Sequence, residues 1–263
     1  MVVIMLKKFG QFIRGRFSSS GYLLGYIGRV FKTSFFFLTH EKSARKILIM
    51  QLLFTFIEAL PLIALLSTAL GSAIYLIGYK FLLSFGRESL IYKVLVMTIV
   101  QEIGPLLVAF VVTARSATAI ATEIGGMVIS HQIESYISFG IDPISYLVAP
   151  RFLGVTASVF FLNLYFCLCG TFGPFLASLI FNPVQASDYL SGIFRSFDLM
   201  SIWVSIVKSI VFGMIVSIAS TYFGFNVERA STEVPVAGIA SVTKSFMFII
   251  IADVLIIIMV ALR

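Results

Sequence analysis

Long apolar stretches with almost no charged residues constrain this chain more than any other feature. Residues 47–79 run for 33 positions without a Lys or Arg, and four further apolar runs follow before residue 263. About 20 such residues cross the hydrocarbon core of a bilayer as a helix. Only 12% of the residues are charged, against about 25% in soluble domains. The sequence therefore predicts an all-α integral membrane protein with about five transmembrane helices.

The apolar runs also give approximate boundaries for the spans. The first run would measure about 50 Å as one straight helix, so we expect a break near Gly71 and a short helix at the outer surface after it. Residues 182–198 are expected to form a polar external loop, and residues 226–243 to return along the cytoplasmic side. Within one transmembrane permease domain over residues 47–263, the expected spans are residues 47–66, 91–117, 152–181, 202–225 and 245–262.

Positive charge is concentrated in residues 1–46. Nine of the 19 basic residues precede Ile47, against the single acid Glu41. In a membrane protein this bias indicates a cytoplasmic N-terminus rather than a nucleic-acid partner. Apolar residues at helical spacing, from Leu6 to Phe17, predict an N-terminal helix lying in the membrane interface; a mobile basic tail is the alternative.

Residues 101–105 place polar groups and a proline inside the second span. A carboxylate at the depth of Glu102 costs a few kcal/mol to insert, so it should face a cavity or a partner rather than lipid. Pro105 lacks the N–H that a helix interior needs and is expected to kink the span beside Gly104. We therefore expect Glu102, Gly104 and Pro105 to form part of a substrate path or its hinge; a hydrogen bond from a protonated Glu102 to another helix is the alternative.

The chain leaves the second span through a short amphipathic segment. Arg115 and Glu123 are eight residues apart on one side of a helix, which predicts an ion pair at the membrane edge; direct contact with substrate is the alternative. Gly125 and Gly126 should then loosen the helix, because glycine is a poor helix former. Residues 127–139 are expected to form a short helix on the cytoplasmic surface between spans two and three, a position suited to transmitting force to a soluble partner.

Other polar residues carry weaker expectations. Glu58 and Asp253 also lie at membrane depth, where they either line a polar path or hydrogen-bond another helix as protonated carboxyls. The two histidines show no metal-ligand spacing and no hydrolase motif is present, so neither a metal site nor catalysis is expected. No G-x-x-x-x-G-K-[ST] loop occurs, so any ATP must be used by another subunit.

A series of short motifs follows along residues 101–151: Glu102-Ile103-Gly104-Pro105, Ala114-Arg115, Thr122 to Met127, Gln132, Ile141-Asp142-Pro143 and Pro150-Arg151. These motifs resemble the signature of the MlaE/YrbE family, permease subunits of ABC-type lipid transporters that work with MCE-domain proteins. The sequence departs from that signature at Gln101, often Arg in the family, and at Ala114 and Ala117, where the family prefers Gly.

This resemblance implies a homodimer enclosing a phospholipid-sized cavity, with cytoplasmic ABC ATPase subunits gripping the surface helix. It also implies an external MCE-domain protein, a small STAS-type cytoplasmic subunit, and a bacterial inner membrane or, as the alternative, a plastid inner envelope. No cofactor bound by this chain is implied. The residues implied to couple the permease to the ATPase are Glu123, Gly125, Met127, Gln132, Asp142, Pro143 and Arg151.

Two other functions remain open from the residues alone. The first is an ion-coupled carrier that uses Glu58, Glu102 and Asp253 as proton sites, although the chain shows no repeated halves of the kind many carriers have. The second is a membrane scaffold that transports nothing and only assembles a partner complex.

Overall fold

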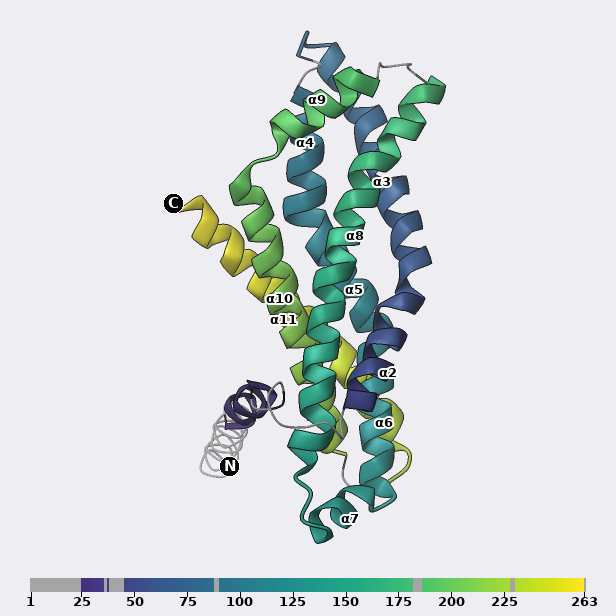
Figure 1. Cartoon of the computed structure of the whole chain (residues 1–263), viewed down its shortest axis with the longest axis vertical. Helices are drawn as coiled ribbons and strands as arrows, with labels where there is room; N and C mark the ends of the chain where they lie inside the picture. Colours follow the sequence, from purple (N-terminus) through teal and green to yellow (C-terminus); the bar gives the residue numbers. More distant parts are fainter. Residues whose placement is uncertain are drawn as a thin grey trace, which may run out of the picture.

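The structure, a computed structural model, describes residues 25–35, 37, 45–87, 90–181, 186–227 and 230–262. The described residues form helices and connecting turns, and five segments are long and apolar enough to cross a membrane, as expected. These segments are Lys46–Leu83, Ile91–Ile129, Ile144–Leu176, Leu199–Phe225 and Glu233–Ala261. They form an elongated bundle with α7 (Gln132–Ser138) at one end and α9 (Ala186–Ser196) at the other (Figure 1). We call these the α7 end and the α9 end.

The first span consists of α2 (Arg45–Thr55), the 3₁₀ turn η1 (Ile57–Ala59) and α3 (Leu60–Leu83). The break expected at Gly71 is absent, since α3 continues through it; the irregularity comes instead just before Pro61, at the start of α3. A Cβ built at Gly71 would lie 2.2 Å from the Gly170 carbonyl oxygen. This glycine therefore allows two helices to approach closely rather than ending one.

The second span is a chain of alternating α and π segments. It comprises α4 (Ile91–Val96), η3 (Met97–Ile103), α5 (Gly104–Val112), η4 (Thr113–Ala117) and α6 (Thr118–Ile129). The helix was expected to loosen at Gly125 and Gly126, but it runs through both to Ile129. Gly125 is buried beside Val227 and Val234, so packing stabilises the helix where local propensity alone would weaken it.

The third span, η5 (Ile144–Val148) followed by α8 (Ala149–Phe181), lies at the centre of the bundle and packs against α2, α3 and α10. Pro174 lies inside α8. The loop expected over residues 182–198 is largely helical instead, because α9 occupies most of it. Tyr189 and Ile193, four residues apart, are both buried, so α9 covers the end of the bundle with its apolar side.

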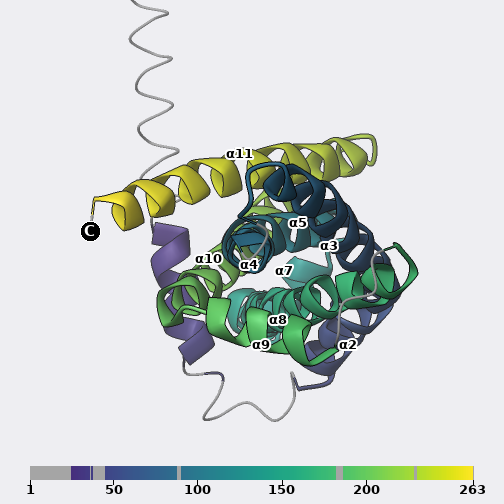
Figure 2. The same cartoon turned by 90° about the horizontal axis from the view of Figure 1, so that it is seen from above.

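The last two spans are α10 (Leu199–Phe225) and α11 (Glu233–Ala261). Asp198 caps α10 by accepting from the Met200 N–H. The fifth span was expected to start at residue 245 and begins twelve residues earlier, so the connection from α10 is much shorter than residues 226–243. Viewed from above, α11 lies along one side of the bundle (Figure 2).

Residues 25–35 form a further helix, which lies crosswise to the bundle near the α7 end (Figures 1 and 2). Its buried residues Tyr26, Val30 and Ser34 recur every fourth position, and the Tyr26 hydroxyl donates to Thr221 Oγ1 at 2.9 Å. Phe35 on its opposite side is 76% exposed. The N-terminal helix predicted from Leu6 to Phe17 lies outside the described residues.

Candidate functional site

A buried lysine connects three helices in the middle of the bundle. The Lys208 side chain of α10 is 0% exposed, and its Nζ lies 2.6 Å from Glu102 Oε2 and 2.8 Å from Asp253 Oδ1. Glu102 belongs to η3 and Asp253 to α11. The two carboxylates keep part of their side-chain surface exposed, 34% and 15%. One ammonium therefore ties the last two spans to the second.

Uncharged polar side chains surround this ionic cluster. The Ser201 hydroxyl donates to Gln101 Oε1 at 3.2 Å, one residue before Glu102. Asn163 Nδ2 of α8 donates to Ser205 Oγ at 2.9 Å. Ser201, Ser205 and Lys208 recur at helical spacing on α10, so a single polar face of that helix meets the second and third spans.

Gly104 and Pro105 lie where η3 changes into α5. The Gly104 N–H donates to the Ile99 carbonyl five residues earlier, which is the π-helical pattern. Both residues are buried, and a Cβ at Gly104 would lie 2.6 Å from the Ile99 carbonyl oxygen. The expected irregularity beside Pro105 is thus a π-helical stretch directly adjoining Glu102, which preserves backbone hydrogen bonding around a residue that cannot donate.

Arg115 and Glu123 do not pair with each other, so the predicted ion pair was wrong. Arg115 pairs with Glu58 of η1 and stacks over the Phe54 ring at 5.6 Å from its centroid. Glu123 Oε1 accepts from Arg151 Nη2 at 2.7 Å. Each pair joins two spans: Arg115 and Glu58 join the second span to the first, and Glu123 and Arg151 join the second span to the third. Side chains on neighbouring helices approach each other more closely than two side chains eight positions apart on one helix.

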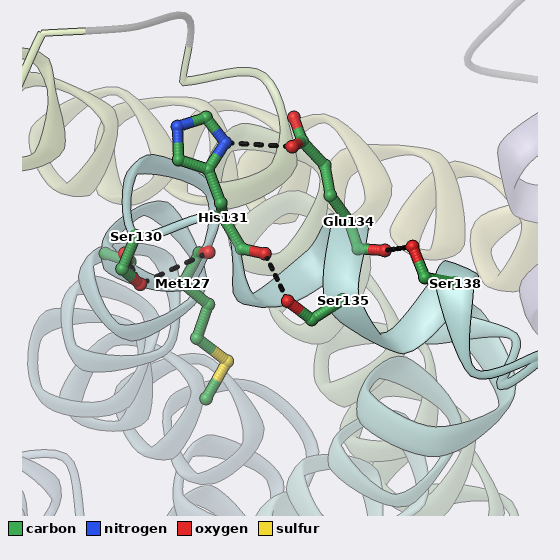
Figure 3. A network of polar contacts seen from close by, with 7 residues as sticks. Met127, Ser130, His131, Glu134, Ser135 and Ser138 are labelled. Carbon is green, nitrogen blue, oxygen red and sulfur yellow. Dashed lines mark hydrogen bonds and ion pairs between the residues drawn. The ribbon is translucent and has the colours of Figure 1, made fainter.

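The junction between α6 and α7 is a tight turn at Ser130 and His131 (Figure 3). His131 has φ 57°, a left-handed conformation that is uncommon for a residue other than glycine. Its Nδ1 lies 2.9 Å from Glu134 Oε2, and its carbonyl accepts from the Ser135 hydroxyl at 3.0 Å. These contacts stabilise the turn with the side chains of α7 itself.

The predicted surface helix is therefore α7, shorter than residues 127–139, and no residue of α7 is buried. Gln132 lies in it, whereas Gly125 and Met127 lie in α6. Asp142 and Pro143 follow the turn at Gly140, which has φ +75°. A cavity of about 550 Å³ separates α7 and this turn from the crosswise helix and the end of α10; Ile133, Ile137, Asp142, Pro143, Arg29 and Tyr222 line it.

Lys208 is the principal residue that sequence reasoning missed. Its signal was available, since it is a lone cation inside an apolar run of membrane length, where ionisable groups mark functional sites by default. Because only the three acidic residues were considered at membrane depth, the sequence predicted no cationic partner for Glu102 and Asp253. Among the residues that the structure describes, no three His, Cys, Asp or Glu side chains are grouped as metal ligands.

Comparison with known proteins gives a consistent set of matches. The model of the family described as Permease MlaE matches residues 48–259. A probable ABC transporter permease protein of Rickettsia typhi is 31% identical over 206 residues, covering 78% of this chain and 80% of that protein. The intermembrane phospholipid transport system permease protein MlaE of Haemophilus influenzae is 24% identical over 174 residues, covering 65% and 66% of the two chains. TRIGALACTOSYLDIACYLGLYCEROL 1 of Arabidopsis thaliana, a chloroplastic protein, is 29% identical over 202 residues, covering 74% of this chain and 56% of that protein.

Proposed function

This chain belongs to the MlaE permease family, and on that premise we propose that it is the membrane subunit of an ABC-type transporter that moves phospholipid with energy from a separate ATPase. The substrate class follows the name of the Haemophilus influenzae relative. The observation that carries the proposal is the helical connection that runs from Glu102 to the end of α6, where a tight turn joins it to α7. A short exposed helix at one end of the bundle is joined through α6, η4 and α5 to a buried ionic cluster.

The proposed mechanism is a lever that acts through this connection. Closure of the ATPase subunits pushes α7 and the Asp142–Pro143 turn, and α6 transmits the displacement. The π-helical stretches η4 and η3, which contain Arg115 and Glu102, take up the strain. The Lys208 cluster carries the motion to α10 and α11, which changes the volume of the lipid cavity.

The assembly that we propose contains two copies of this chain, cytoplasmic ATPase subunits, an external MCE-domain protein and a small STAS-type subunit. Exposed apolar surface supports the dimer, since only 11% of the apolar stretch of α11 that could cross the membrane is buried within one copy. We place this assembly in the bacterial inner membrane, with the N-terminus and the α7 end of the permease in the cytoplasm. The alternative of a plastid inner envelope draws support from the Arabidopsis relative.

Ion coupling receives less support from the geometry. Each of the three carboxylates that would carry protons, Glu58, Glu102 and Asp253, contacts a cationic side chain. These contacts favour a role in joining helices over a free proton site.

The test is affinity purification from the native membrane in mild detergent, with mass spectrometry of the proteins and lipids retained. An ABC ATPase, an MCE-domain protein and phospholipid in one complex are expected. A complex without any ATPase would refute the transporter, and an ion-coupled carrier would then take precedence. A scaffold is excluded if Glu102→Gln assembles normally but loses lipid transport.

A further inference from the structure

A second cavity, of about 570 Å³, lies between α2, α6 and the start of α8 near the α7 end. Its walls combine apolar and charged side chains. Met50, Phe54, Ile120, Met127 and Leu147 supply the apolar part, and Lys46, Glu123 and Arg151 the charged part. Lys46, Met50 and Glu123 are exposed, so the mouth of the cavity is accessible from outside the protomer.

Arg151 lies in the wall of this cavity and has one donor without a hydrogen-bond partner among the described residues. Its side chain is 4% exposed; Nη2 contacts Glu123 at 2.7 Å and Nη1 donates to the Leu147 carbonyl at 3.0 Å. Its Nε is buried without a hydrogen-bond partner among the described residues. A buried N–H with no acceptor costs about 1–3 kcal/mol, so a shift of the Arg151 side chain that brings Nε to an acceptor oxygen in the cavity would relieve that cost. Guanidinium groups bind phosphate oxygens, like carboxylate oxygens, with matched geometry.

The polar lining continues from the cavity toward the middle of the membrane. Phe54 lines the cavity and also lies under the Arg115 guanidinium, which pairs with Glu58. Arg115 lies eight residues along the helix from Glu123, about 12 Å deeper. We call this track, from Lys46 through Arg151 and Glu123 to Arg115 and Glu58, the α2–α6 groove.

The depth of the groove follows from the crosswise helix. We take residues 25–35 to lie at the membrane interface, as the sequence predicts for the N-terminal segment; their packing on Phe152 and Thr221 then puts Arg151 at that level. With this placement Arg115 and Glu58 lie within the hydrocarbon layer, although their side chains are 31% and 55% exposed. An exposed ion pair at that depth is costly against acyl chains, which indicates that this face meets polar groups.

We propose that the α2–α6 groove binds the phosphate headgroup of a membrane phospholipid, with Arg151 and Lys46 as the phosphate ligands at its mouth. The acyl chains remain in the bilayer beside Met50 and Phe54, and the Arg115–Glu58 pair receives the headgroup as it moves inward. Three cations and two carboxylates give the groove one excess positive charge, which suits a phosphate. The inference deepens the proposed function and rests on it, because it supplies the route by which phospholipid enters or leaves through this leaflet.

The test uses the full chain in phosphatidylcholine nanodiscs containing a small fraction of phospholipid with a photoreactive headgroup. After illumination, mass spectrometry maps the labelled residues. Labelling is expected at residues 46–58 and 115–127 and is expected to fall about tenfold in Lys46→Gln. Lys32→Gln, an exposed lysine of the crosswise helix, is the matched control and should leave it unchanged. Arg151→Lys keeps a cation beside Glu123 but removes Nε, and it should also reduce labelling.

Three outcomes would overturn the inference. Labelling confined to residues near Lys46, with none at residues 54–58 or 115–119, would show surface adsorption only. Equal loss in Lys46→Gln and Lys32→Gln would show a nonspecific charge effect. Binding of inorganic phosphate without any labelling by the phospholipid would show a free-anion site. If the assembled complex transports phospholipid although the groove is unlabelled, headgroup binding in the groove is refuted and the proposed transport function stands. If the groove is labelled but the complex does not transport phospholipid, the transport function is refuted and headgroup binding stands.

Discussion

At the scale of single residues, replacement of Lys208 should lower the stability of the fold through the charges that it leaves uncompensated. Removing a buried cation leaves Glu102 and Asp253 without compensation at membrane depth, and breaking a buried pair in this way typically costs about 3–5 kcal/mol. The partial exposure of Glu102 should place Lys208→Met near the lower limit, about 3 kcal/mol. Thermal unfolding in detergent would measure the loss.

The control for Lys208 is the triple variant Lys208→Met, Glu102→Gln, Asp253→Asn. It removes all three charges together, so no uncompensated ion remains, and most of the lost stability should return. A triple variant as unstable as Lys208→Met would show that packing of the lysine side chain, rather than its charge, holds the three helices.

Tyr189 makes a prediction about pH. Burial, together with the neighbouring Tyr75 and Tyr92, raises the pKa of the Tyr189 phenol above its ordinary value, and its hydroxyl donates to the Thr171 carbonyl at 2.7 Å. A raised pKa means that the neutral form is favoured by folding. Its stabilising effect should therefore be complete below about pH 10 and decline as pH rises further.

The measurement is thermal stability of wild type and Tyr189→Phe across roughly pH 8 to 11. The phenylalanine ring of the variant cannot ionise, so the advantage of the wild type, about 1 kcal/mol for the hydrogen bond, should narrow above about pH 10. A constant difference over the whole range would contradict a pKa raised by burial.

The unusual charged residues could be predicted from the sequence, but the residues with which they form ion pairs could not. Glu102, Arg115 and Glu123 were each recognised as unusual because charge in or beside an apolar run is costly. Spacing along one helix, however, only relates residues of that helix. The contacts of Arg115 with Glu58 and of Glu123 with Arg151 depend on how the helices pack, which local spacing does not contain.

At the scale of helices, close contact between α3 and α8 depends on glycine. Gly71→Ala would place a methyl group 2.2 Å from the Gly170 carbonyl oxygen, so α3 must shift, at a cost of about 2 kcal/mol. Gly126→Ala is the control, because a Cβ at Gly126 meets nothing within 4 Å and alanine favours the helix. Thermal midpoints should fall for the first and hold or rise for the second. Equal losses would contradict the packing role.

Helix boundaries, too, depend on packing between helices as well as on the local sequence. The excess length of the first apolar run suggested a break near Gly71, and low helix propensity suggested loosening at Gly125, but both residues are buried between helices. In a membrane, backbone hydrogen bonds have no water to replace them, so the helix persists. The helix α9 was missed because its polar residues outweighed the spacing of Tyr189 and Ile193, an amphipathic signal that the residues did contain.

At the scale of the whole molecule, the two ends carry different tasks. Aromatic packing of Tyr189 against Tyr75 and Tyr92 closes the α9 end. The α7 end instead leaves an exposed helix, a cavity beside it and a charged groove above it. Rigid packing at one end and exposed, hinged elements at the other are what a lever operated from a single side of the membrane requires.

Two glycines test this difference between the ends. Gly140 at the α7 end and Gly86 at the α9 end have φ +75° and +65°, with nothing within 4 Å of a built Cβ, so Gly140→Val and Gly86→Val should impose similar strain, about 1–2 kcal/mol. Both should lower the thermal midpoint alike. Only Gly140→Val should displace α7, and we expect about tenfold weaker binding of the ATPase to it, measured by co-purification from equal amounts of permease. Equal ATPase loss in both variants would show that global stability, not the position of α7, controls assembly.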